Sequence, residues 1–274
     1  MKPGANELPH LSRIFVYPIK SARGIEVTET RVGMSGPLRD RRWMLVNDDG
    51  LALTQRTLPK MVLMAPRFEA DDLIVDAPDM PSLQIRSWAG EGEWIQVRIW
   101  DDDLRAPHPD RAYSDWFSSF LGQSCRLVHL PDAVVRPVEA PYHQAPWRVS
   151  LADAYPLLVL GQASLDLLNE KLDAPVAMER FRPNLVVAGC AAHEEDIWAR
   201  VRVGGVELAT VKQCARCAIP LVDPATAQTG IEPMRTLAQY RKVGEKVKFG
   251  QNALVITPGL LRVGATVETH EAPG

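Results

Sequence analysis

The chain has 274 residues, of which 46% are hydrophobic, and its 31 Lys and Arg oppose 34 Asp and Glu. At roughly 150 residues per domain, this length predicts one large domain or two modest ones. The net charge of −3 disfavours a nucleic-acid-binding protein. The sequence contains no apolar run of about 18 residues, so no membrane span is predicted. Four cysteines are too few for a disulfide scaffold, so we expect a reducing, cytoplasmic setting.

Short strands are predicted through the N-terminal part of the chain. Residues 11–17 are rich in β-branched and aromatic side chains, and Pro18 ends this segment. Residues 43–46 run into the turn-forming residues 47–50. Further along, residues 83–86 and 95–99 alternate between apolar and polar, which is typical of half-buried strands.

A helix is predicted between Asp110, a suitable N-cap, and Gly122, a suitable C-terminal stop. Its aromatic residues recur with helical spacing, which favours a core-facing stripe over a ligand-binding box. They are Tyr113, Trp116, Phe117 and Phe120, followed by Leu121.

The proline-rich residues 131–150 predict a connection between two domains, packed across the surface. A strand at 156–160 and a helix bearing Leu165, Leu168 and Leu172 are expected next. The remaining expected strands are 184–188, a hairpin of 201–203 and 206–208 around Gly204-Gly205, and closing strands at 254–257 and 266–268. The predicted fold class is mainly β with flanking helices (α+β), built from β-barrel or sandwich domains.

The sharpest chemical feature is Cys214-Ala215-Arg216-Cys217, directly after a predicted strand. A zinc half-site would need a second cysteine pair, and a thioredoxin-like dithiol would need to open a helix. A single thiolate ligand for a soft, redox-active metal is the third possibility. Two packed, purely structural cysteines are the fourth.

Cations stand at the ends of predicted strands, where they suit an anionic ligand or simply form solvated loops. They are Lys20, Arg39, Arg41, Arg42, Arg180 and Arg182. The acidic runs 101–103 and 193–196 are expected to be solvated loops, without the spacing of a calcium site.

Two series of motifs resemble the MOSC family, named for molybdenum cofactor sulfurases. The C-terminal series is Phe181-Arg182-Pro183-Asn184, Gly189-Cys190, Glu195-Asp196-Ile197-Trp198, Cys214-Ala215-Arg216-Cys217 and Val222-Asp223-Pro224. The N-terminal series is Val16-Tyr17-Pro18-Ile19-Lys20-Ser21, Gly36-Pro37-Leu38-Arg39-Asp40-Arg41 and Leu53-Thr54-Gln55-Arg56. The resemblance, which extends to the amidoxime-reducing component and its bacterial relatives, implies a MOSC N-terminal β-barrel domain at 8–130 and a MOSC domain at 131–270.

The resemblance also implies a site for a molybdenum cofactor, with Cys217 as the protein ligand of the metal. It implies that Lys20, Ser21 and Arg41 hold the pterin phosphate. Further cofactor-lining positions implied in the same way are Asp153, Ala154, Tyr155, Arg182, Asn184, Ala215, Arg216 and Asn252. Animal relatives have Ser at the position of Ala215 and Tyr at that of Asn252. These two differences affect which electron donor and which range of substrates are expected.

The implied activity is two-electron reduction of N-hydroxylated bases, amidoximes or hydroxylamines. No clustered-cysteine domain follows Val267, so we expect a separate electron donor of the ferredoxin or flavoprotein reductase type. A non-redox cofactor carrier or a sulfur-transfer protein with a Cys persulfide is the alternative. A two-barrel scaffold without metal is the third possibility.

Overall fold

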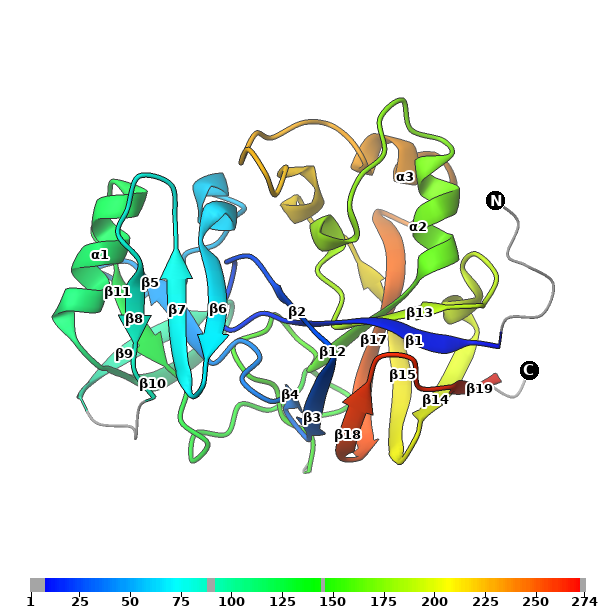
Figure 1. Cartoon of the computed structure of the whole chain (residues 1–274), viewed down its shortest axis with the longest axis horizontal. Coiled ribbons are helices and arrows are strands. Elements are labelled where there is room, and N and C mark those ends of the chain that lie inside the picture. The colour runs from blue at the N-terminus through cyan, green and yellow to red at the C-terminus, as the bar shows by residue number, and fades with distance from the viewer. Residues whose placement is uncertain (1–7, 88–91, 144–145, 272–274) are drawn as a thin grey trace.

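The structure is a computed structural model that describes residues 8–87, 92–143 and 146–271. It is mainly β with three α-helices in this part of the chain, so the predicted class is confirmed (Figure 1). The helices are α1 (Arg111–Leu121), α2 (Gln162–Asn169) and α3 (Met234–Tyr240). The strands are β1 (His10–Val16), β2 (Ile25–Val27), β3 (Glu29–Gly33), β4 (Gly36–Pro37), β5 (Trp43–Val46), β6 (Ala65–Glu69), β7 (Asp72–Asp76), β8 (Leu83–Ile85), β9 (Glu93–Ile99), β10 (Asp102–His108), β11 (Arg126–His129), β12 (Leu157–Gly161), β13 (Leu185–Ala188), β14 (Trp198–Val203), β15 (Val206–Ala215), β16 (Lys242–Val243), β17 (Lys246–Thr257), β18 (Gly259–Arg262) and β19 (Val267–Glu271).

One large sheet organises the C-terminal half, with the order β19-β14-β15-β17-β12-β13-β1-β2 and β16 beside β17. Its ends are not joined by a strand ladder, so the sheet is open, although an isolated bridge links His10 to Thr266. The N-terminal strand β1 belongs to this sheet and pairs antiparallel with β13. β1 therefore lies beside β13 of the C-terminal half (Figure 1). Lys20 and Ser21 follow β1 in the sequence, so they come directly after a strand of this sheet.

Burial of apolar side chains stabilises this sheet. Val201 and Val203 of β14, and Val206 and Leu208 of β15, are at most 1% exposed and join one core cluster. Gly204-Gly205 forms the predicted turn of their hairpin, with Gly204 at a left-handed φ of 56°. Successive side chains of a strand point to opposite faces of the sheet, so these apolar residues face the core. Polar residues at the strand ends can then line other sites.

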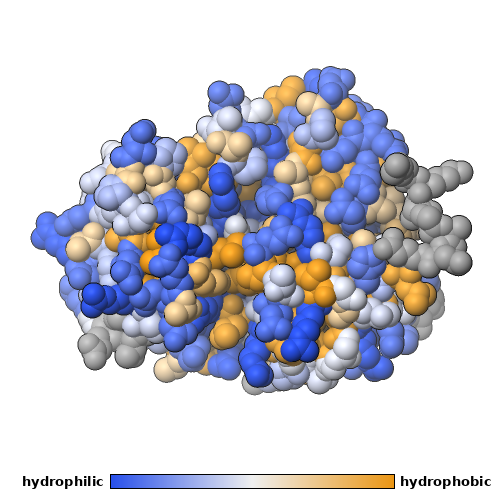
Figure 2. All heavy atoms as spheres, viewed as in Figure 1, coloured by the Kyte–Doolittle hydropathy of each residue, from blue (hydrophilic) through white to orange (hydrophobic). Residues whose placement is uncertain are grey.

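The N-terminal lobe consists of smaller sheets covered by α1 (Figure 1). Asp110 caps α1 by accepting a hydrogen bond from the backbone N–H of Ala112, and Gly122 ends it at φ 72°. Trp116, Phe117 and Phe120 are buried against the lobe's core, which confirms the prediction of a core-facing stripe. On the viewed face, hydrophobic residues gather in a band across the middle of the molecule, along the course of β1 (Figure 2).

The proline-rich connection contains no helix or strand in its described residues, which exclude 144 and 145. It packs through Arg136, a side chain that is 3% exposed and donates to the carbonyls of Ser150, Ala152 and Asp153. The division into domains at 130/131 stays a proposal, and β1 and β2 pair across it with the sheet of the C-terminal half.

Three expectations were wrong in detail. Asp102 and Asp103 of the run 101–103 lie in β10 rather than in a solvated loop, and Asp102 pairs with the buried Arg136. Helix α2 ends at Asn169, so Leu172 packs near the core from outside the helix. The run 193–196 is not simply a solvated loop, because Glu195 is fully buried and accepts a hydrogen bond from Ser164 Oγ at 2.7 Å. Acidic composition alone did not reveal that this carboxylate has a buried hydroxyl partner.

Candidate functional site

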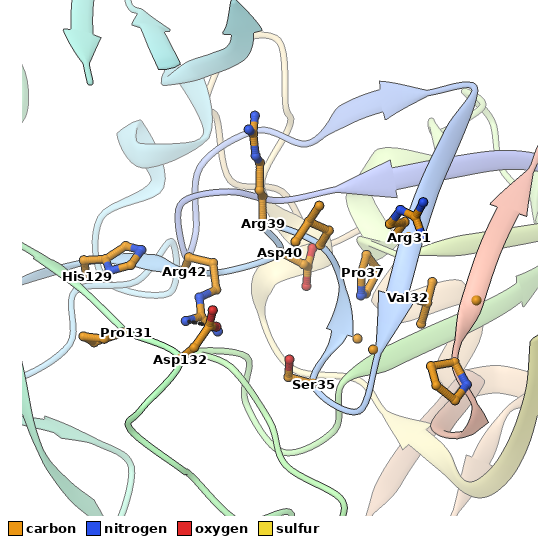
Figure 3. Close-up of a pocket in the computed structure, with 15 residues that line it drawn as sticks. Arg31, Val32, Ser35, Pro37, Arg39, Asp40, Arg42, His129, Pro131 and Asp132 are labelled. Atoms are coloured by element: carbon orange, nitrogen blue, oxygen red, sulfur yellow. Dashed lines mark ion pairs between the residues drawn. The ribbon is translucent and has the colours of Figure 1, made fainter. Parts of the chain in front are cut away.

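Several cavities border cationic side chains, and two of them are candidate sites for an anionic ligand. The larger, about 800 Å³, is an open groove (Figure 3). Its Arg42 pairs with Asp132 at 2.8 Å, and its Arg39 pairs with Asp71 at 2.5 Å. These guanidinium groups already have carboxylate partners, and no cysteine lines the groove, so it does not match the predicted chemistry.

The second cavity, about 310 Å³, is bounded by residues from both halves of the chain. All twelve residues named above for the cofactor site line it, although they are spread over more than two hundred positions of sequence. They are Lys20, Ser21, Arg41, Asp153, Ala154, Tyr155, Arg182, Asn184, Ala215, Arg216, Cys217 and Asn252. The structure therefore brings the whole predicted set together, while their roles toward a ligand remain a proposal.

Lys20 and Ser21 form one edge of this pocket. The backbone N–H of Lys20 donates to the carbonyl of Trp43, and Ser21 takes a left-handed φ of 66°. The carbonyl of Ser21 accepts a hydrogen bond from Gln55 Nε2 at 2.7 Å. These contacts fix a tight turn after β1 and hold both residues almost completely buried.

The Tyr17 ring organises two of the site's arginines. The guanidinium carbons of Arg41 and Arg182 lie 4.4 and 4.3 Å from its centroid. Both arginines have left-handed backbones, with φ of 46° and 56°. Burial lowers the pKa of Arg182 to about 10, which leaves it cationic at neutral pH. An aromatic face thus holds two cations that would otherwise repel each other.

Asn184 joins this pair to the sheet. Its side-chain amide donates to the Phe15 carbonyl and to Asp40 Oδ1, while its Oδ1 accepts from Arg41 Nη1 at 3.2 Å. Asp40, 1% exposed, also pairs with Arg41 at 2.5 Å. The Arg-Pro-Asn motif therefore supplies one arginine to the pocket and an amide that orients another.

Asp153 is the pocket's main counter-charge. It pairs with Lys20 Nζ at 2.5 Å and with Arg56 Nη2 at 2.6 Å. Burial opposes the ionisation of Asp153, but the two cations outweigh it and hold the pKa of that carboxyl well below its usual range. Burial in turn lowers the pKa of Lys20, and Asp153 counteracts this effect.

Cys217 lies just beyond the end of β15, in the loop that begins at Arg216. The backbone N–H of Arg216 donates to the Val247 carbonyl, and its Nη1 lies 3.1 Å from Cys214 Sγ. Cys217 Sγ lies 3.5 Å from Arg56 Nη2. Both cysteines are free thiols that line the pocket. A lining thiol beside a guanidinium is a suitable ligand for a soft metal.

Three charged residues of the pocket were not among the predicted site residues: Arg56, Glu139 and Lys212. Glu139 accepts from Tyr155 Oη at 2.8 Å and pairs with Lys212. Arg56 carried a signal, since it ends the Leu53-Thr54-Gln55-Arg56 motif. Conversely, Arg39, Arg42 and Arg180 do not line this pocket, and Arg180 pairs with Asp223 instead.

An anionic group fits the pocket. Six cationic side chains line it against the carboxylates of Asp153 and Glu139; the cations are Lys20, Arg41, Arg56, Arg182, Lys212 and Arg216. The Nε atoms of Arg56 and Arg216 are buried and have no hydrogen-bond partner among the described residues. Since buried donors without acceptors are costly, oxygen atoms of an anionic ligand would satisfy them.

A bare metal ion fits less well. Within residues 8–87, 92–143 and 146–271, no group of three or more His, Cys, Asp or Glu side chains is placed to hold one. A metal bound to Cys217 would therefore need further ligands from an organic cofactor. The donor set matches an anionic cofactor that carries its own sulfur ligands.

Comparisons with known proteins show the family of the chain. Residues 8–124 match the MOSC N-terminal beta barrel domain, and residues 146–268 match the MOSC domain. This defines the class: a MOSC-domain protein with both domains in one chain.

Curated relatives narrow the family further. The chain is 36% identical over 279 residues to mitochondrial amidoxime-reducing component 1 of Mus musculus, covering 94% of this chain and 81% of the mouse protein. It is 35% identical over 278 residues to mitochondrial amidoxime reducing component 2 of Homo sapiens, covering 94% and 82%. The Xenopus laevis component 1 is 32% identical over 277 residues, covering 94% and 81%. The chain belongs to the amidoxime-reducing component family of MOSC proteins.

No helix in the described part of the chain has both the length and the apolar character that are needed to cross a membrane.

Proposed function

We propose that this protein is a molybdenum-cofactor-dependent reductase of N-hydroxylated compounds. The observation that carries the proposal is the meeting of the Cys217 thiol with six cationic side chains in a single pocket. One ligand, an anionic metal cofactor, explains both features at once.

In this proposal the cofactor's phosphate lies against Lys20, Ser21 and Arg41, where buried cations and a hydroxyl converge. Arg182 and Arg216 offset the remaining negative charge, and Asn184 keeps Arg41 in place. The backbone segment Asp153-Ala154-Tyr155 and the side chains of Ala215 and Asn252 complete the walls. Cys217 supplies the protein sulfur to the metal.

The bound metal would supply the two electrons for the reaction. In the overall reduction the N–O bond of the substrate breaks and two electrons are consumed; one added proton goes to the nitrogen, and the other goes to the hydroxyl oxygen, which leaves as water. The chain's own contribution is to bind and orient the cofactor and to set the charge around it. The relatives are named for the reduction of amidoximes, which are the proposed substrate class together with other N-hydroxylated bases and hydroxylamines.

The electrons would come from a separate donor protein of the ferredoxin or flavoprotein reductase type. A reducing, cytoplasmic compartment is part of the same proposal, supported by four cysteines that are all free thiols. No nucleic acid or membrane partner is proposed.

The test uses protein loaded with cofactor in a molybdenum-replete host, a reduced donor dye and benzamidoxime. Formation of benzamidine with consumption of two electrons per product supports the reductase. Stoichiometric molybdenum without any product formation would instead favour the carrier alternative. Protein that is folded but contains no molybdenum after expression in such a host, and takes up none on incubation with the cofactor, would contradict both.

A further inference from the structure

Arg56 is the residue of the N-terminal half that reaches the thiol of Cys217. Its Nη2 lies 3.5 Å from Cys217 Sγ and 2.6 Å from Asp153 Oδ2. Its side chain is 19% exposed. A single guanidinium group thus touches both the proposed metal ligand and the pocket's main carboxylate.

Trp100 covers this guanidinium. The carbon at the centre of the Arg56 guanidinium lies 4.7 Å from the centroid of the indole ring. Trp100 stands in the turn between β9 and β10, has a left-handed φ of 55° and is 56% exposed. A bulky residue in that backbone conformation is strained.

The turn that carries Trp100 is tied back to the same carboxylate residue. Arg136 Nε donates to Asp102 Oδ2 at 2.6 Å, and Arg136 Nη2 donates to the carbonyl of Asp153 at 2.9 Å. Asp153, Arg56, Trp100, Asp102 and Arg136 therefore form a closed circuit of contacts. This circuit holds the guanidinium of Arg56 in place from two sides.

We propose that Arg56 is a positioning residue that orients the sulfur of Cys217 toward the metal, and that Trp100 locks Arg56 in that position. This inference rests on the proposed function. A long arginine side chain has many rotamers, so a stack on one face and an ion pair at its end restrict it strongly. A fixed guanidinium then restricts the torsion of the thiolate that it contacts, as outer groups around metal ligands do.

The experiment compares Arg56→Met, Arg56→Lys, Trp100→Ala and Trp100→Phe in cofactor-loaded protein. Trp94→Ala and Arg98→Gln are matched controls on the same hairpin, because Trp94 is also partly exposed and Arg98 pairs with Asp103. The readouts are kcat and KM for benzamidoxime, molybdenum content, and the sulfur-to-molybdenum charge-transfer absorption, which depends on the orientation of the thiolate.

Arg56→Met is expected to shift the charge-transfer absorption and to lower kcat about 10- to 100-fold per bound molybdenum, with KM within about 2-fold. Trp100→Ala is expected to shift the same absorption and to lower kcat about 3- to 10-fold, and Trp100→Phe and Arg56→Lys to restore part of the loss. The two control variants, Trp94→Ala and Arg98→Gln, should leave the charge-transfer absorption and kcat unchanged. Because Trp100 is largely exposed, its variants test the inference even if the Arg56 variants fold poorly.

Wild-type absorption and kcat in Arg56→Met and Trp100→Ala would overturn the inference. A rise in KM alone would also overturn it, since Arg56 would then bind substrate rather than position the sulfur. Wild-type protein that binds no molybdenum or reduces no amidoxime is a different result, because that outcome refutes the proposed function itself.

Discussion

Lys20 Nζ and Asp153 Oδ1 lie 2.5 Å apart in the pocket, although 133 positions separate the two residues in sequence. The pair joins the turn after β1 to the segment before β12, and Lys20 is 5% exposed. Lys20 Nζ also donates to the Leu151 carbonyl at 3.0 Å, so one of the three N–H donors of this buried ammonium group remains for a phosphate oxygen. This relationship places a cation where the proposed cofactor needs one.

Lys20→Met is therefore expected to weaken cofactor binding about 10- to 100-fold, the usual cost of one charge-assisted hydrogen bond. The measurement is molybdenum and pterin per chain after dialysis at a series of protein concentrations. Lys60→Met is the matched control, because Lys60 contacts the Phe120 carbonyl and ring outside the pocket. Equal cofactor retention in both variants would show that Lys20 does not hold the phosphate.

Two neighbouring Asp–Arg pairs allow a test of burial. Asp40 is 1% exposed and accepts from the Tyr17 backbone, Asn184 and Arg41, whereas the side chain of Asp71, the partner of Arg39, is 79% exposed. Asp40→Ala leaves three groups without their acceptor, so we expect the free energy of unfolding to fall by about 3 to 5 kcal/mol.

Asp71→Ala should cost less than about 1 kcal/mol, because water screens an exposed pair. Urea unfolding of both variants without cofactor measures the two values. Similar losses in the two variants would contradict the buried network around Asp40.

His129 should make stability depend on pH. Its ring packs against Trp43 with 4.4 Å between centroids, and burial, reinforced by Arg42, lowers the pKa of His129 to about 4. The unfolded chain binds this proton near pH 6.5, so stability is complete above that pH and declines as the pH falls toward 4.

The decline attributable to His129 is at most about 3.5 kcal/mol, since one pKa unit is worth about 1.4 kcal/mol. Urea unfolding of the wild type and of His129→Phe at several pH values between about 4.5 and 7.5 isolates this contribution. The variant should show a flatter dependence than the wild type. Parallel curves would mean that His129 binds its proton equally well in the folded and the unfolded protein.

Local features of the fold could be predicted from the sequence. Helix α1 is confirmed at both ends because Asp110 and Gly122 act on the nearest backbone groups, and the hairpin of β14 and β15 follows from its two glycines. The pairing of β1 with β13 could not be predicted, because it depends on contacts between residues about 170 positions apart. The strands β2 and β4, with three and two residues, are too short to show a period.

The residues of the candidate site likewise fall into those that could be predicted from the sequence and those that could not. Motif resemblance collected twelve residues that line one pocket, but cation spacing alone also suggested Arg39, Arg42 and Arg180, which pair with carboxylates elsewhere. Arg56 was not assigned to the site, because its contact with Cys217 spans 161 positions and is created only by the fold. Side-chain direction at the end of a loop is a tertiary property that periodicity does not encode.

The central claim is that Cys217 bonds the metal of an anionic cofactor in this pocket. X-ray absorption at the molybdenum edge of loaded wild-type protein and of Cys217→Ser tests it directly, with Cys214→Ser as the matched control. We predict that Cys217→Ser loses one sulfur neighbour of the metal and essentially all amidoxime reduction, while Cys214→Ser keeps the wild-type sulfur count. An unchanged sulfur count in loaded Cys217→Ser would contradict the account.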